Sequence, residues 1–113
     1  MGRNIARGVQ PVTASGQLPN VDISTNTDAD VNKIYWVNTT AGVLTITLPP
    51  QPNKGDIVRI FDVANTFDTN ALTINRNGRP IMSAADNLTV NTEGAAFDLI
   101  YYDNTLGWRI FTI

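Results

Sequence analysis

Hydrophobic and polar residues alternate with a period of two along most of the chain after residue 31. In the segment 43–48 (VLTITL), Leu44, Ile46 and Leu48 share one face of an extended strand, while the residues between them share the other. No segment shows the 3.6-residue period of an amphipathic helix. About eight short strands at this spacing predict an all-β fold, either a small antiparallel β-sandwich or a jelly-roll-like barrel. The segments that show the alternation are 33–38, 43–48, 57–63, 72–75, 88–91, 97–102 and 108–112.

Turn residues between these segments predict how the strands are joined. The four residues 39–42 are expected to link the segments on either side as a hairpin. Asn77-Gly78 is a strong tight-turn signal. A closing hairpin is expected around residues 103–107.

The first thirty residues differ in composition from the rest of the chain. Residues 1–30 contain no aromatic side chain and are interrupted by Pro11, Gly16 and Pro19. We therefore expect an extended N-terminal arm over 1–30, followed by a β domain over 31–113. An arm with so little core material needs a surface to dock on.

Several expected strands are apolar on both faces. In the last strand Trp108 and Ile110 point to one side, while Phe111 and Ile113 point to the other. A strand in a small soluble fold normally has one wet face, so a second copy of the chain is expected to cover the other. The alternative is that the arm or a loop covers it. The residues predicted to form this subunit interface are Tyr35, Ile100, Tyr102, Phe111 and Ile113.

Composition narrows the range of possible functions. The chain has 113 residues and contains neither histidine nor cysteine, so the commonest acid–base group and the commonest thiol nucleophile are missing. The net charge of −2 makes a general nucleic-acid or anionic-membrane partner unexpected. We therefore expect a structural or binding protein with no catalytic residues and no cofactor, rather than an enzyme.

Four stretches of the sequence resemble a β module that recurs in virion proteins of tailed bacteriophages: 48–62 (LPPQPNKGDIVRIFD), 70–81 (NALTINRNGRPI), 87–102 (NLTVNTEGAAFDLIYY) and 107–110 (GWRI). The resemblance implies a homotrimer on the phage particle, either as a capsid decoration or at the end of a fibre. Because a fibre protein usually has a long shaft before such a module, the short arm favours a small capsid decoration (cement) protein. Such a protein would sit on the capsid surface of the virion and bind the major capsid protein. The alternative is the terminal domain of a head or tail fibre that binds a host surface glycan.

The candidate capsid-binding residues lie in the arm: Arg3, Asn4, Ile5 and Arg7. The two arginines stand in an otherwise uncharged segment, and their guanidinium groups are suited to acidic groups on a capsid surface. The alternative is that they are ordinary charges that favour solubility.

Two sets of charged residues are weaker candidates for functional sites than the arm. Asp22, Asp28 and Asp30 are the acidic residues of the arm, but they lack the spacing, glycine and terminal glutamate of an EF-hand, so no metal site is expected. A second group flanks the expected turns and is interpreted as strand-edge charges and ion pairs rather than as a catalytic carboxylate pair. Its members are Asp56, Arg59, Asp62, Arg76 and Arg79.

Four aromatic residues are open to two interpretations. Trp36, Tyr101, Tyr102 and Trp108 could line a sugar-binding groove. Because they alternate with aliphatic residues at strand spacing, we expect them in the core or at a subunit interface.

Overall fold

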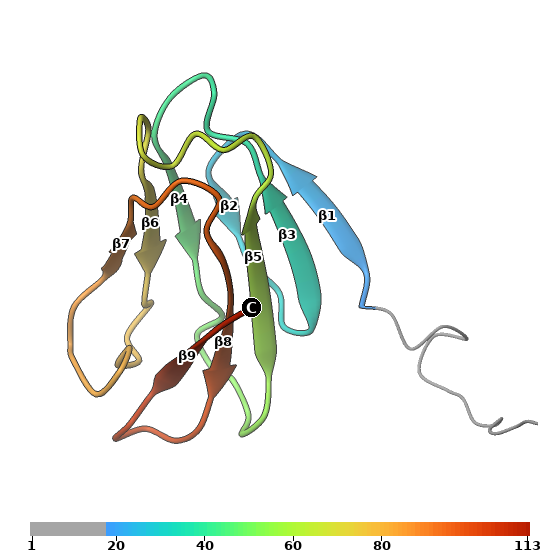
Figure 1. Cartoon of the computed structure of the whole chain (residues 1–113). Coiled ribbons are helices and arrows are strands. Elements are labelled where there is room, and N and C mark those ends of the chain that lie inside the picture. The colour runs from blue at the N-terminus through green and yellow to red at the C-terminus, as the bar shows by residue number, and fades with distance from the viewer. Residues whose placement is uncertain (1–17) are drawn as a thin grey trace, which may run out of the picture.

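The computed structural model describes residues 18–113 and is built from strands, with no helix in that range (Figure 1). The strands form a five-stranded sheet in the order β1-β3-β5-β8-β9 and a four-stranded sheet in the order β2-β4-β6-β7. Their bounds are β1 Asn20–Ile23, β2 Thr27–Asp28, β3 Lys33–Val37, β4 Leu44–Thr47, β5 Ile57–Asp62, β6 Leu72–Asn75, β7 Leu88–Val90, β8 Ala96–Tyr101 and β9 Trp108–Thr112.

The first six strands wind between the two sheets. Strands β1, β3 and β5 pair in parallel in one sheet, and β2, β4 and β6 pair in parallel in the other. Each turn of the chain thus adds one strand to each sheet, as in a short solenoid. Strands β7, β8 and β9 then pair antiparallel with their neighbours. The all-β prediction is confirmed, but the sheets are mixed and form no closed barrel, so the antiparallel and jelly-roll-like expectations are wrong.

The predicted hairpin at residues 39–42 is also wrong, because β3 and β4 lie in different sheets. Those residues cross from one sheet to the other and stack on the next crossing of the chain. The hydroxyl groups of Thr39 and Thr66 are hydrogen-bonded at 2.8 Å, and the Asn70 side-chain amide donates to the Thr39 carbonyl oxygen at 2.8 Å. These bonds give hydrogen-bond partners to polar groups that are buried where the chain crosses between the sheets.

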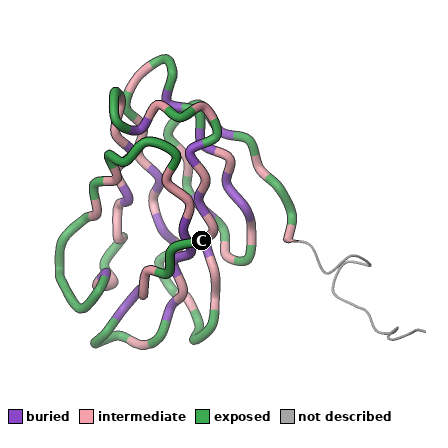
Figure 2. Tube along the Cα trace, in the orientation of Figure 1, coloured by how far each residue is buried: buried purple, intermediate pink, exposed green. Residues whose placement is uncertain are grey.

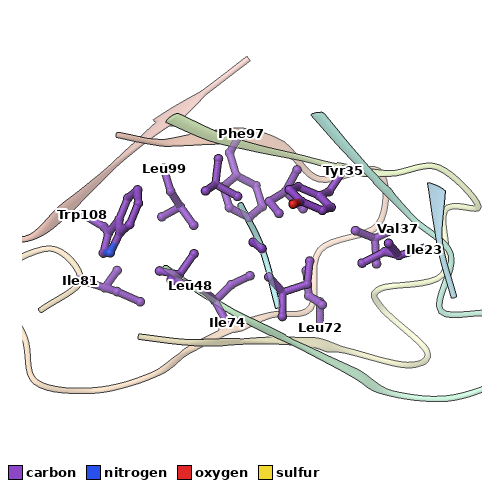
Figure 3. Packing of buried hydrophobic residues seen from close by; sticks show 14 of the residues in the cluster. Ile23, Tyr35, Val37, Leu48, Leu72, Ile74, Ile81, Phe97, Leu99 and Trp108 are labelled. Atoms are coloured by element: carbon purple, nitrogen blue, oxygen red, sulfur yellow. The ribbon is translucent and has the colours of Figure 1, made fainter. Parts of the chain in front are cut away.

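The core lies between the facing sides of the two sheets (Figures 2 and 3). Parallel pairing places like residues side by side in the four-stranded sheet, with Leu44 next to Leu72 and Ile46 next to Ile74. Facing them from the other sheet are buried residues of β3, β5, β8 and β9. The fully buried core residues on the strands of the two sheets are Val37, Ile46, Val58, Ile60, Leu72, Ile74, Leu99 and Trp108.

Asp62 is a buried carboxylate that organises two loops. It accepts hydrogen bonds from the backbone N–H groups of Thr66, Phe67 and Gly94, each at 3.0 Å. These bonds hold the loop that inserts the fully buried Phe67 into the core. The expected strand-edge charge at Asp62 is therefore wrong, because the carboxylate is buried and accepts from backbone donors.

The folded part of the chain includes residues that composition alone assigned to the arm. Strands β1 and β2 fall within 20–28, where Val21 lies beside Tyr35 and Ile23 beside Val37 in parallel register. These two apolar side chains contribute to the core, so residues 20–28 belong to the β fold. The part of the arm that precedes residue 18 lies outside the described residues.

The predicted closing hairpin is confirmed as β8–β9, with Tyr101 paired with Trp108. The Asp103 carboxylate accepts from the N–H groups of Leu106 and Thr105, which lowers the pKa of Asp103 below its ordinary value. Gly107 has a φ of +71°, and a side chain there would overlap the carbonyl oxygen of Pro80. Glycine is therefore required at this end of the turn.

Replacing Trp108 with alanine is expected to lower the free energy of unfolding by about 3–5 kcal/mol, because the indole is fully buried. Trp108→Phe should cost much less, since the indole N–H is buried without a hydrogen-bond partner among the described residues. Denaturant unfolding measures both changes, and Thr89→Ala at an exposed position of β7 is the control. Equal losses for the alanine and control variants would contradict the placement of Trp108 in the core.

Candidate interaction face

The side of the five-stranded sheet that faces away from the core is rich in apolar residues. We call this surface the outer face. Two polar residues, Arg59 and Asp98, lie near its middle. Its apolar members come from β3, β5, β8 and β9 and are Ile34, Trp36, Ile57, Phe61, Ile100 and Phe111.

Strand register places two aromatic side chains of the outer face against each other. Trp36 lies beside Phe61 in the β3–β5 pairing, and their rings stack with centroids 4.6 Å apart. The indole N–H of Trp36 donates to the side-chain oxygen of Asn20 on β1 at 2.9 Å. The stacking and this bond hold a flat aromatic surface at one end of the outer face.

The two charges near the middle of the outer face neutralise each other. Arg59 Nε and Nη2 donate to the two carboxylate oxygens of Asp98 at 2.7 and 3.0 Å. The hydrogen bond to Asp98 raises the pKa of Arg59, and Asp98 is only 8% exposed. A bidentate pair of this kind fixes both side chains and compensates their charges. Two further charged residues of this face, Asp22 on β1 and Arg109 on β9, lie on its edge strands.

Four of the five predicted interface residues lie at or near the surface. Phe111 is 54% exposed, Ile113 62% and Tyr102 45%, whereas Ile100 is half-buried on the outer face. The Tyr102 ring is covered on one side by the ammonium group of Lys54, 4.0 Å from its centroid.

Tyr35 is a correction, because it is 2% exposed and packs in the core. Both faces of its strand are apolar, so alternation could not reveal which face points inward. The parallel pairing with Ile60 places Tyr35 inside, and its hydroxyl oxygen accepts from the Asp30 N–H at 2.7 Å. Trp36, on the opposite side of the strand, is the residue that faces outward.

Sequence reasoning missed the centre of the outer face. Alternate residues of β5 point to the same face, and on the outer face these are Ile57, Arg59 and Phe61. This alternation is the feature of the sequence from which a second surface on the strand could have been predicted. The pairing of Arg59 with Asp98 joins residues 39 positions apart. Only the β5–β8 register brings the two together.

The remaining charged candidates do not form a site. The Asp30 carboxylate pairs with Lys33 at 3.0 Å, and residues 18–113 contain no group of three or more potential ligands that could hold a metal ion. Asp56 accepts from the Asn53 N–H, while Arg79 Nε donates to the Pro50 carbonyl oxygen. These contacts stabilise turns. The arm residues Arg3, Asn4, Ile5 and Arg7 lie outside the described residues.

The four aromatic residues considered for a sugar groove are divided between the core and the surface. Tyr101 and Trp108 are buried and meet edge to face, with centroids 5.3 Å apart. Trp36 lies on the outer face, and Tyr102 follows the end of β8. They therefore do not line one groove.

Comparison of the sequence with known protein families and with curated proteins finds no match. Within residues 18–113, no helix is long and apolar enough to cross a membrane. The outer face, together with the residues that resemble the phage module, is therefore the feature from which we infer function.

Replacing Asp98 with alanine is expected to lower the free energy of unfolding by about 1–2 kcal/mol, because it removes both acceptors of a partly shielded guanidinium group. Asp30→Ala is the matched control, since it breaks an ion pair whose carboxylate is exposed to solvent. We expect no measurable loss for the control. Denaturant unfolding of both variants checks the difference, and equal losses would argue against a stabilising role for the Arg59–Asp98 pair.

Proposed function

We propose that this chain is a structural virion protein: a homotrimeric capsid decoration, or cement, protein that stabilises a phage head. The observation that carries the proposal is the apolar outer face, which a second copy of the chain is suited to cover. The trimer and the position on the capsid come from the resemblance of residues 48–110 to the phage module.

The chemistry of the outer face supports an interface between proteins. Interface centres are enriched in aromatic residues and arginine and contain few unpaired charges. Trp36, Phe61 and Phe111 supply the aromatic surface, and Arg59 is already paired with Asp98. Contact with another copy over the middle of this face would remove apolar groups from water without burying an unpaired charge there.

The arm supplies the proposed attachment to the shell. Arg3 and Arg7 would pair with acidic groups of the major capsid protein, with Asn4 and Ile5 between them. Each trimer would then present three arms and bridge neighbouring capsomers. The added contact area would oppose the pressure of packaged DNA on the shell.

A host-glycan-binding fibre tip is the second candidate, and one feature of the surface favours it. A hollow of about 260 Å³ lies beside Trp36 and is also lined by Asp22, Ser24 and Asn38. An indole next to carboxylate, hydroxyl and amide groups suits a sugar ring. Copy number on purified particles separates the two functions, because a decoration protein occurs in hundreds of copies and a fibre tip in only a few trimers.

Phe111→Asp is expected to dissociate the trimer while leaving each copy folded, because this ring is more than half exposed in the single chain. Val43→Asp is the control, since Val43 is 69% exposed next to β4 in the other sheet and should leave the trimer intact. Light scattering at micromolar concentration measures the mass. A monomeric wild-type protein that also fails to assemble on the virion would refute the trimer.

Reversing the arm charges with Arg3→Glu and Arg7→Glu is expected to leave the trimer intact and to weaken its binding to undecorated capsids at least tenfold. The same reversal at Arg76, which follows β6 in the four-stranded sheet, is the control for a charge change in the β domain. Co-sedimentation with capsids measures the affinity. Equal binding by all three proteins would show that the arm charges do not attach the protein to the shell.

A further inference from the structure

The two sheets leave an apolar cleft between β7 and the β8–β9 hairpin. It has a volume of about 290 Å³, and none of the residues that line it, all within 18–113, is charged. We call it the β7–β9 cleft. Its apolar walls come from Leu88, Val90, Ala95, Phe97 and Ile110, and Thr112 lies at its rim.

The edge of β9 beside this cleft has unused backbone groups. Ile113 donates its N–H to Ala96 on β8, so by the alternation of an antiparallel ladder Ile110 and Thr112 direct their N–H and C=O groups away from β8. Trp108 has the same orientation and bonds to Pro80 and Met82 at 2.9 and 2.8 Å.

The backbone hydrogen bonds between this edge of β9 and residues 80–82 stop after Trp108. The N–H of Ile110 meets the Met82 sulfur at 3.3 Å, which is a weak acceptor, and no backbone partner for this edge of β9 follows among the described residues. The last half of the strand can therefore accept a further strand.

The opposite edge of the same sheet is protected. It is formed by β1, which places Asn20 and the charged Asp22 on the outer face. Polar and charged residues discourage strand addition at an edge. The described chain begins just before β1, so residue 18 and the β7–β9 cleft lie on opposite sides of the sheet (Figure 1).

We propose that residues 8–17 of one copy occupy the β7–β9 cleft of a neighbouring copy and add a strand to the edge of β9. The segment GVQPVTASGQ carries no charge, which matches the uncharged lining of the cleft, and it supplies Val9 and Val12 as apolar groups. Only residues 18 and 19 link this segment to β1, and the three Cα–Cα steps from residue 17 to Asn20 span at most about 11 Å. The two sheet edges of one copy are separated by four strand spacings, or about 19 Å, so the segment suits the cleft of a neighbouring copy rather than its own.

This exchange of arm segments between copies rests on the proposed trimer, and it specifies how three copies form a closed ring. A donor on one edge and an acceptor on the opposite edge form a head-to-tail interface, and such an interface closes into a ring when the rotation between copies permits. Three copies would then each give one arm and receive one. Arg3 and Arg7 precede the exchanged segment, so they stay available for the capsid.

Disulfide trapping tests the exchange in the full-length chain, which contains no cysteine of its own. We would combine Thr112→Cys with Val9→Cys, Val12→Cys or Ala14→Cys in turn, oxidise the protein and separate the products without reductant. At least one pair should give covalent trimers in most of the protein. Gln51→Cys replaces Thr112→Cys in the control, because Gln51 is exposed and does not line the cleft.

The outcomes are distinct. Bonds within single chains would show that the arm docks on its own copy and would overturn the exchange. Trapping no stronger than the Gln51 control, in a protein that light scattering shows to be a trimer, would overturn the exchange and leave the trimer standing. A monomer by light scattering would overturn both.

A charge placed in the cleft provides a second test. Val90→Asp puts a carboxylate against the proposed occupant and should reduce the trapped trimer at least fivefold. Val43→Asp, the same change at an exposed residue that does not line the cleft, should not reduce it. Circular dichroism shows whether each variant is folded. Equal trapping in two folded variants would also contradict the exchange.

Discussion

The packing of the two sheets onto one apolar core is the interaction on which the rest of the structure depends. Parallel pairing sets Ile46 beside Ile74 in the four-stranded sheet, and their side chains face the inner residues of the five-stranded sheet. Once alternate residues of β3, β5, β8 and β9 are committed to this core, the residues between them must point outward. The apolar outer face is thus set by the same strand register that builds the core.

This constraint connects the fold to its proposed role. Strands that are apolar on both sides need a partner on the second side, and in the proposed trimer other copies of the chain would supply it. The bidentate pair of Arg59 and Asp98 makes such contact feasible because it leaves no unpaired charge at the middle of the outer face. The cleft beside β9 offers a second route by which copies can be joined, through an added strand.

The sequence predicted the segments that form β3 to β9, the β8–β9 hairpin and the burial of Trp108, because alternation and turn chemistry are local signals. It did not predict β1 and β2, which lie in the part assigned to the arm. It did not predict parallel pairing, although LTIT at 44–47 and LTIN at 72–75 repeat and lie side by side. Short alternating segments suit either polarity, and a four-residue link between strands resembles a hairpin even where it crosses between sheets. Tyr35 was placed on the wrong face for a related reason, since period two gives two faces without saying which is inside.

The central claim is that other copies of this chain cover the outer face, and the two tryptophans allow a direct measurement. In a Trp108→Phe background, Trp36 on the outer face is the sole remaining indole. Acrylamide quenching of its fluorescence should fall as the protein concentration is raised through the range in which the oligomer forms. Quenching that stays constant while the mass increases would show that the copies meet through another surface and would contradict the account.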